Sequence, residues 1–243
     1  MKVAAIIQAR TGSTRFPSKV FAPLADKPLL WHIVNRLTFS KQINEIIVAT
    51  TTSENDNVIE DWALQNGMNI FRGSEEDVLA RYYEAAKFFK ADIIVRVTAD
   101  DPFKDPEIID AVIEILKSEK LDFAYNNNPP SFPEGLDTEV FTFEAIEKAF
   151  LNAKDNFERE HVTQYFYRNP TLFKHKNYAY FENKSYLRWT LDTVQDYEMV
   201  KQVYNHLYKE ETIFLMNDIF ELLKKYPAIA NMNLNVKRSA MYS

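Results

Sequence analysis

Short apolar segments of strand length alternate with helical patterns through the first half of the chain. In the helical patterns, apolar residues recur three and four positions apart, as in a helix that buries one face. A strand that returns to a parallel neighbour through a helix forms a right-handed unit, and repeated units build a mostly parallel sheet covered on both faces. The sequence therefore predicts an α/β fold, a three-layer α/β/α sandwich with a Rossmann-like sheet. The expected strands are 2–9, 45–51, 69–73 and 92–100, and the expected helices are 28–40, 56–67, 74–89 and 105–118.

The second half of the chain changes character at residues 128–143, which hold three prolines and one of the four glycines. Such a segment is typical of a loop followed by a hairpin. We expect a single domain over residues 1–243, with an inserted lobe at about 126–181. The later expected helices are 143–153, 156–170, 194–209 and 218–227, and the later expected strands are 173–181 and 187–192.

The first strand leads into a loop rich in cations and hydroxyl groups, within the stretch "IIQARTGSTRFPSK" at residues 6–19. Arg10, Arg15 and Lys19 can neutralise phosphate oxygens, and Gly12 permits a φ angle that brings backbone N–H groups together. In open parallel sheets, ligands bind beyond the carboxyl ends of the strands, where this loop begins. The loop matches neither a Walker loop nor a dinucleotide-binding loop. On charge alone, an anion cradle and a solvated surface loop fit equally well.

The distribution of charge favours a small anionic ligand over a polymer. The chain has a net charge of −6, whereas residues 1–27 carry five basic side chains and one acid. An acidic protein lacks the broad basic surface of a nucleic-acid binder. The sequence has no cysteine, and we find no apolar stretch long enough to cross a bilayer. We therefore expect a cytoplasmic protein without nucleic-acid or membrane partners.

Carboxylates occur at the ends of two predicted strands. Asp100 and Asp101 end the strand at 92–100, and Asp192 ends the strand at 187–192. Carboxylates at strand ends can converge on Mg²⁺, which prefers oxygen ligands and usually keeps waters beside substrate phosphates. Asp196 is either another ligand or, preferably, a cap of the following helix. Together with the basic loop, Asp100 and Asp192 predict a nucleotide and metal site.

Polar residues of the second half offer weaker candidates. Asp137 and Glu139 follow a glycine turn and are either substrate contacts or exposed acids of a hairpin. His161 lies beside Arg159 and Glu160 and can orient a sugar hydroxyl or carboxylate, although a lone helical histidine is more often structural. Ser74 is expected to cap the helix at 74–89, with Asp77 at its third position.

An ordered set of motifs resembles the SpsF-like branch of the cytidylyltransferase family, which is named for spore coat polysaccharide biosynthesis. Acylneuraminate and 3-deoxy-manno-octulosonate cytidylyltransferases are related to this branch. The resemblance runs from about Lys2 to Tyr204. It rests on "IIQARTGSTRFPSKV", "LADKPLLWHIVNRL", "EIIVATTT", "IFRGSEEDVLARYYEAA", "VRVTADDPF", "FPEGLDTEVF", "EREHVT" and "LRWTLDTVQDYEMV".

The resemblance implies a nucleotidyltransferase of GT-A-like fold that transfers CMP from CTP to an acidic sugar or related acid, with Mg²⁺ as cofactor and pyrophosphate as leaving group. Arg10, Lys19 and Asp100 are then the catalytic residues, and Asp100 and Asp192 are the metal ligands. The family analogy also implies a homodimer through about residues 126–181. The nucleotide-binding residues that it implies are Ala9, Arg10, Gly12, Ser13, Arg15, Lys19, Thr50, Thr51, Gly73, Ser74 and Asp77. The acceptor-binding residues that it implies are Asp137, Glu139, Arg159, Glu160 and His161.

Two other classes of function compete with this one. A GT-A-type glycosyltransferase also holds a nucleotide sugar and a metal at strand ends, but it has no γ-phosphate to contact, which leaves the basic residues from Arg10 to Lys19 less well explained. A non-catalytic nucleotide-binding protein would tolerate loss of the metal site. The acceptor stays open, because Gln8 stands where the sialate and octulosonate enzymes have proline, as in the SpsF-like branch.

Overall fold

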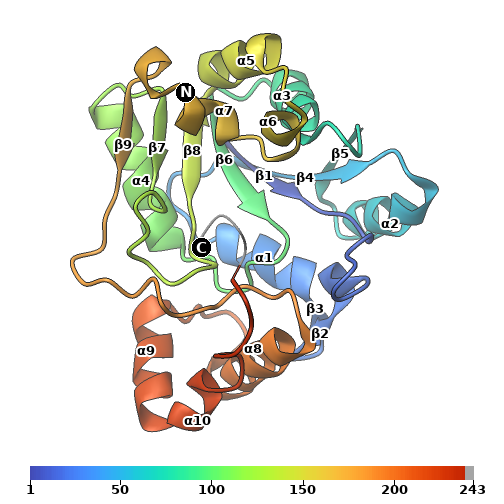
Figure 1. Ribbon diagram of the computed structural model, residues 1–243. Coiled ribbons are helices and arrows are strands. Elements are labelled where there is room, and N and C mark those ends of the chain that lie inside the picture. The colour runs from blue at the N-terminus through green and yellow to red at the C-terminus, as the bar shows by residue number, and fades with distance from the viewer. Residues whose placement is uncertain (239–243) are drawn as a thin grey trace.

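The computed structural model describes residues 1–238 of the chain, and these form a central sheet of seven strands. The strand order is β5-β4-β1-β6-β8-β7-β9 (Figure 1). All strands run parallel except β8, which is antiparallel to both of its neighbours. The strands are β1 Val3–Gln8, β4 Glu45–Thr51, β5 Asn69–Gly73, β6 Ile93–Thr98, β7 Phe123–Tyr125, β8 Glu139–Thr142 and β9 His175–Asn177, and β2 Pro23–Leu24 pairs with β3 Lys27–Pro28 in a separate ribbon.

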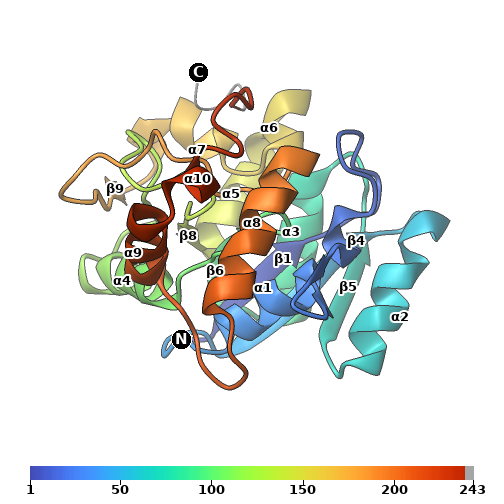
Figure 2. The ribbon, with the colours of Figure 1, turned by 90° about the horizontal axis from the view of Figure 1, so that it is seen from below.

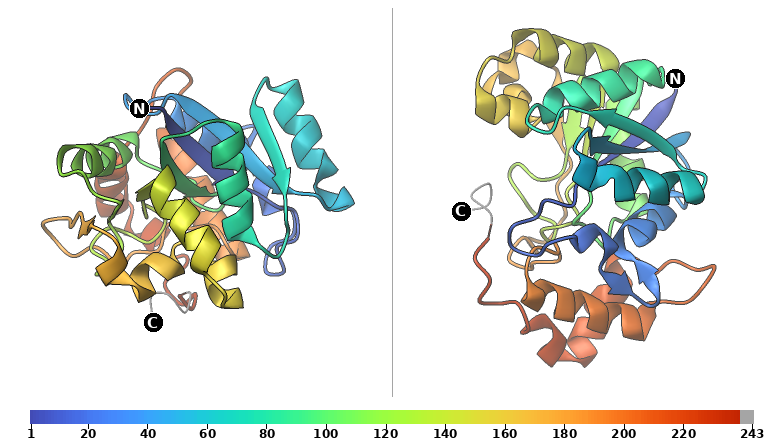
Figure 3. Two further views of the ribbon diagram at one scale, coloured as in Figure 1. Left: turned by 90° about the horizontal axis from the view of Figure 1, so that it is seen from above. Right: turned by 90° about the vertical axis from the view of Figure 1, so that its right-hand side faces the viewer.

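Helices cover both faces of this sheet (Figure 3). Side chains of β1 alternate between two apolar clusters, with Val3, Ala5 and Ile7 in one and Ala4 and Ile6 in the other. The first cluster is covered by α1, α2, α4, α8 and α9, and the second by α3, α5 and α7. Because both faces are buried at the centre of the sheet, β1 is apolar from Val3 to Ile7. The predicted three-layer sandwich is confirmed. The helices are α1 Leu29–Leu37, α2 Asn57–Gln65, α3 Val78–Phe88, α4 Pro106–Ser118, α5 Phe143–Asn152, α6 Asn156–Glu160, α7 Gln164–Arg168, α8 Val194–Leu207, α9 Met216–Lys225 and α10 Pro227–Ala230, with short 3₁₀ turns η1 Lys19–Phe21, η2 Glu54–Asp56 and η3 Pro170–Leu172.

The chain changes its direction of travel across the sheet between β1 and β6. From β1 it moves outward through β4 to β5, and it then returns to add β6 on the other side of β1. In open parallel sheets, ligands bind at the carboxyl ends of the strands at such a switch point. The basic loop follows β1 and Asp100 follows β6, so both flank this position.

Residues 187–192 do not form the predicted strand. Arg188 makes only an isolated bridge to Glu134, and the backbone N–H groups of Trp189 and Leu191 donate to Glu134 and Asp100, each at 2.8 Å. The segment thus bonds to the loops before β8 and after β6 rather than to a neighbouring strand. Trp189 and Leu191 are buried there. These two apolar side chains thus mark burial in the core and not a strand of the sheet. The bond from Leu191 to Asp100 places Asp192 beside the loop that holds Asp100.

The hairpin expected after residue 128 belongs to the main sheet. Its observed strand, β8, pairs with β7, which precedes that stretch, and with β6. The following helix, α5, packs against α3 in the same apolar cluster. Within the segment 126–181, β8 and α5 therefore extend the central sandwich.

Two helix boundaries also differ from the predicted ones. Asp77, not Ser74, caps α3, because its Oδ1 accepts from the backbone N–H of Ala80 at 2.9 Å. Ser74 Oγ instead accepts from the backbone N–H of Asp77. Residues 156–170 form two short helices, α6 and α7, separated by Val162 in a left-handed conformation with φ 53°.

Candidate active site

The loop after β1 is fastened to the neighbouring strand through Asp56, which is buried at the N-terminus of α2. Asp56 Oδ1 accepts from Thr11 N at 2.7 Å and from Thr11 Oγ1 at 2.8 Å. Asp56 Oδ2 accepts from the hydroxyl of Thr51 at the end of β4. The carbonyl of Thr11 then accepts from the backbone N–H groups of Ser13 and Ser18. These bonds hold residues 11–18 as a closed turn beyond the end of β1.

Gly12 does not have the conformational role predicted for it. Its φ lies outside the left-handed range, and a Cβ added there would meet no atom within 4 Å. The left-handed residue of the loop is Ser18, with φ 54°. Gly12 instead leaves its stretch of the loop without a side chain, so the backbone there is exposed.

Lys19 reaches from this loop to the two predicted metal ligands. Its Nζ lies 3.0 Å from Asp100 Oδ2 and 2.7 Å from Asp192 Oδ1, and it also donates to the carbonyl of Leu191 at 3.1 Å. The Lys19 side chain is only 12% exposed. The structure therefore brings together three residues that are far apart in the sequence, all of which were predicted as site residues.

The three charges stabilise one another. Burial alone would lower the pKa of Lys19, but Asp100 and Asp192 outweigh it, so the pKa lies above its ordinary value. Burial alone would raise the pKa of Asp100, but the adjacent Lys19 lowers it to about 2. At neutral pH the site therefore holds the Lys19 ammonium ion beside the ionised Asp100.

Arg10 and Arg15 lie at the surface of the same loop. Arg15 Nη2 is 2.9 Å from Asp192 Oδ2, and Arg10 Nη1 is 3.9 Å from Glu75 Oε1. Both arginine side chains are about half exposed, at 51% and 53%. Of the three predicted cations, Lys19 is thus largely buried, whereas Arg10 and Arg15 are exposed and can reach a polyanion.

Asp100 and Asp192 fit a hard divalent cation, because they offer carboxylate oxygens that converge on one point, where the Lys19 ammonium now lies. Within residues 1–238 no group of three or more histidine, aspartate or glutamate side chains is arranged to hold a metal ion. A cation here would therefore complete its shell with waters and substrate oxygens, as Mg²⁺ does beside phosphates.

Asp101 points elsewhere. Its carboxylate accepts from Thr98 Oγ1 at 2.7 Å and lies 2.8 Å from Lys104 Nζ. Asp101 and Lys104 are both buried. Of the two neighbouring aspartates, Asp100 thus belongs to the site and Asp101 to the core.

Most of the uncharged residues expected to bind the nucleotide are buried at the edge of the sheet. Thr50 and Thr51 are fully buried, and Ala9 is buried with its N–H bonded to the carbonyl of Ala49. Gly73 lies against Arg81, since a Cβ at Gly73 would come within 3.0 Å of Arg81 Cγ. The remaining expected residues at this edge are half-buried Ser13, exposed Ser74 and half-buried Asp77, the last of which is engaged in capping α3.

Glu139 anchors a polar cluster on β8. Its carboxylate accepts from Arg96 Nη1 at 2.7 Å and from Tyr167 Oη at 2.8 Å, and Tyr167 also donates to Asn127 Oδ1 at 2.7 Å. Glu139 is 2% exposed, which excludes the interpretation as an exposed hairpin acid. Among the described residues, the buried Nε of Arg96 has no hydrogen-bond partner.

The other expected acceptor residues are dispersed around this cluster. Arg159 donates to Asp77 and to the carbonyl of Phe150, so its guanidinium joins α6 to α3 and α5. Burial lowers the pKa of His161, the adjacent Glu160 opposes this effect, and the charge of Arg96 adds to it. Glu160 is exposed, and the carbonyl of Asp137 accepts from Lys104 Nζ. Burial raises the pKa of Tyr167, and Glu139 and Asp137 add to that effect, so Asp137 as well as His161 interacts with the Glu139 cluster.

Sequence reasoning missed Asp56, Arg96 and Arg188. Asp56 has the signal of a helix cap, and its contact with Thr11 depends on the fold. Arg96 carries a clearer signal, because it is a charged residue inside an otherwise apolar central strand. Arg188 has a similar signal, because it is a charged residue between the apolar Leu187 and Trp189. In the structure its Nη2 lies 3.1 Å from Asp192 Oδ2.

A family model and a similar protein both match most of this chain. Residues 4–224 match the family model described as Cytidylyltransferase. The spore coat polysaccharide biosynthesis protein SpsF of Bacillus subtilis is 33% identical over 233 residues, which cover 93% of this chain and 95% of SpsF.

Two solved structures share the fold. A cytidylyltransferase from Leptospira borgpetersenii is 36% identical, with a TM-score of 0.90 over 98% of this chain and 99% of that one. A CMP:2-keto-3-deoxy-manno-octonic acid synthetase complexed with CTP has a TM-score of 0.65 at 16% identity, over 86% of this chain and 100% of that one. At that identity the second likeness shows the fold alone.

Proposed function

This chain belongs to the cytidylyltransferase family, and on that premise we propose that it transfers CMP from CTP to an acidic sugar or a related acid, with Mg²⁺ as cofactor. In the reaction, an oxygen of the acceptor bonds to the α-phosphorus of CTP. The bond from that phosphorus to the bridging oxygen breaks, and pyrophosphate leaves. The observation that supports this most directly is the contact of Lys19 Nζ with both Asp100 and Asp192 at the switch point of the sheet.

The residues of the loop supply charge neutralisation. Phosphoryl-type transfer depends mainly on alignment and on stabilising charge at the phosphate oxygens. Lys19, Arg15 and Arg10 lie on one loop whose position is fixed by Asp56, and we assign them to the triphosphate. Asp100 and Asp192 would hold Mg²⁺, which would supply positive charge to offset that of the phosphate groups.

The Glu139 cluster is our candidate for the acceptor site. The unpartnered Nε of Arg96 suits a carboxylate, and Glu139 and Tyr167 suit sugar hydroxyl groups. SpsF is named for polysaccharide biosynthesis, so we place the product in the assembly of a surface polysaccharide or glycoconjugate. We also propose a cytoplasmic homodimer. In the described residues no helix is long and apolar enough to cross a membrane.

A screen for pyrophosphate release tests the proposal. The protein is mixed with Mg²⁺, each nucleoside triphosphate and a panel of acidic sugars and sugar phosphates, and CTP binding is measured separately by calorimetry. We expect release with CTP and one class of acid, and a loss of at least about 100-fold in Asp192→Asn. Asp26→Asn is a matched control, because Asp26 is exposed and its left-handed φ of 64° suits asparagine.

The glycosyltransferase alternative predicts a different product. A glycosyltransferase would consume a nucleotide sugar and release a nucleoside diphosphate, with no need for a triphosphate. No binding at millimolar CTP, or turnover of a nucleotide sugar instead, would contradict our proposal.

A further inference from the structure

A buried cluster of charges lies against Asp192. The Arg188 guanidinium donates to three carboxylates, with Nη2 at 3.1 Å from Asp192 Oδ2, Nη1 at 3.0 Å from Glu134 Oε1, and Nε at 2.9 Å from Asp196 Oδ1. Its side chain is 5% exposed, compared with 53% for Arg15 and 12% for Lys19, the other two cations on Asp192. Of these three cations, Arg188 is the one fixed in the protein interior.

The same cluster holds the backbone of Asp192. Asp196, which is fully buried, accepts with Oδ2 from the backbone N–H groups of Asp192 at 3.1 Å and Thr193 at 3.0 Å. Asp196 therefore takes part in capping α8, as preferred from the sequence, and it also holds Arg188. The main chain and the carboxylate of Asp192 are thus fixed by one bonded pair, Arg188 and Asp196.

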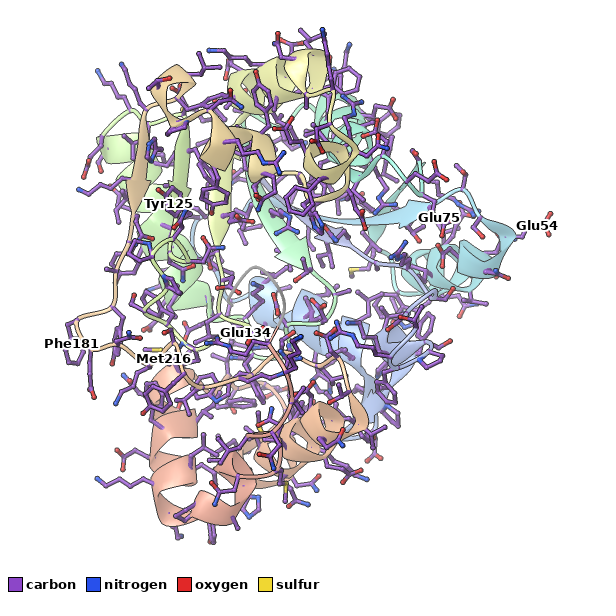
Figure 4. The ribbon with its side chains drawn as sticks, viewed as in Figure 1. Glu54, Glu75, Tyr125, Glu134, Phe181 and Met216 are labelled. Atoms are coloured by element: carbon purple, nitrogen blue, oxygen red, sulfur yellow. The ribbon has the colours of Figure 1, made fainter. Side chains whose placement is uncertain are left out.

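The C-terminal segment, residues 231–238, completes the cluster. Asn233 Nδ2 donates to the carbonyl of Arg188 at 3.0 Å and to Asp196 Oδ1 at 2.9 Å, and Arg238 Nε donates to Glu134 Oε2 at 2.9 Å. Figure 2 shows α8, α9 and α10 side by side, and in Figure 4 Glu134 lies near the centre of the molecule beside the C-terminal segment. The family match ends at residue 224, so it gives no role to Asn233 or Arg238.

We propose that Arg188, held by Asp196 and by Asn233 of the C-terminal segment, is a positioning residue that presents Asp192 to a divalent cation. The inference rests on the proposed function, because it takes Asp192 as a metal ligand. Groups that orient a metal ligand strongly affect metal affinity even though they do not touch the ion. Arg188 and Asn233 thereby connect the last segment of the chain to the catalytic edge of the sheet.

The test measures how strongly a divalent cation and CTP favour each other's binding. The Kd of CTP is measured by calorimetry without acceptor, once in EDTA and once in saturating Mn²⁺, and the ratio of the two values is the coupling factor. Asn233→Ala removes both hydrogen bonds of Asn233 to this cluster, and we expect it to reduce the coupling factor at least roughly fivefold, with metal-free CTP binding unchanged. Asn235→Ala is the matched control, because Asn235 is exposed two residues away.

A second variant distinguishes the positioning of Asp192 by Arg188 from the mere attachment of residues 231–238 to the rest of the chain. Arg188→Lys keeps the charge but loses the planar, multiple hydrogen bonds, and we expect it to reduce the coupling factor by roughly tenfold or more. If Arg188→Lys does not fold, Asn233→Ala still decides the question. A lower melting temperature with an unchanged coupling factor would overturn the inference, since the cluster would then be structural only.

The outcome for the unaltered protein distinguishes the two proposals. If it binds no CTP under either condition, the proposed function itself fails. If it binds CTP and shows coupling to Mn²⁺ that Asn233→Ala and Arg188→Lys leave intact, only the positioning role fails. If it binds CTP equally in EDTA and in Mn²⁺, the metal assignment fails and the positioning role fails with it.

Discussion

Two neighbouring aspartates show how different the roles of adjacent residues can be. Asp100 contacts Lys19 at the site, and Asp101 is buried against Lys104 and Thr98. We expect Asp100→Asn to lose at least about 100-fold in kcat while remaining folded. Asp101→Asn leaves the buried Lys104 without its charged partner, so it should lower the free energy of unfolding by about 3 kcal/mol. Chemical denaturation and pyrophosphate release on both variants check this, and equal losses of activity at equal stability would contradict it.

Single residues were predicted well where their chemistry stands out in the sequence. Lys19, Asp100 and Asp192 were expected as one site. In the structure, Lys19 Nζ lies within 3.0 Å of a carboxylate oxygen of each aspartate. Asp56 and Arg188 were not expected, because their roles arise from contacts across 45 and 4 residues that only the folded chain defines. Arg159 shows the reverse case, since its charge suggested an acceptor contact and the fold directs it to Asp77.

At the scale of elements, strands buried on both faces were the easiest to predict, because a short and continuously apolar run bounded by polar residues is typical of such a strand. The expected strand at 45–51 matches β4 to the residue, and the last five residues of β4 are buried. The expected strand at 69–73 also matches β5, although this edge strand is only partly buried. The segment 187–192 misled the prediction because residues 188–192 are all buried without pairing in a strand of the sheet. Its hydrogen bonds to Glu134 and Asp100 depend on long-range packing.

The packing of α1 against α8 predicts a pH dependence of stability. His32 on α1 is buried, donates to the carbonyl of Leu24 at 2.6 Å and lies 4.4 Å from the ring of Tyr204 on α8. Burial lowers the pKa of His32 from 6.5 to about 4. Between these values the unfolded chain binds the proton and the folded protein does not, so stability falls as the pH falls from 6.5 to 4. This group alone should account for about 3 kcal/mol.

Chemical denaturation at several pH values checks this expectation. In His32→Gln, the amide nitrogen can replace the donor to Leu24, and this part of the pH dependence should disappear. His206→Gln, at an exposed position of α8, is the control and should keep the slope of the unaltered protein. An identical slope in His32→Gln would show that His32 does not carry the effect.

For the whole molecule, the three residues at the centre of the candidate site meet within one chain. Lys19, Asp100 and Asp192 come from three segments far apart in sequence, and each contact among them is intramolecular. The sandwich provides these contacts by placing the loops after β1 and β6 next to each other, with the segment 187–192 bonded to the second of them. A proposed homodimer therefore need not supply these three residues.

The expected homodimer leads to a prediction for the assembled protein. Phe181 is 87% exposed at the end of the segment 126–181, and in Figure 4 it projects outward from the edge that carries β9. Exposed large apolar side chains beside a short edge strand are typical of surfaces that are covered by a partner. We expect light scattering to give twice the mass of one chain, and Phe181→Asp to shift the protein to monomers. Leu64→Asp, on α2 at 60% exposure, should leave the dimer intact.

Because Lys19, Asp100 and Asp192 meet within one chain, monomeric Phe181→Asp should retain CTP binding. A strict monomer for the unaltered protein at micromolar concentration would contradict the dimer.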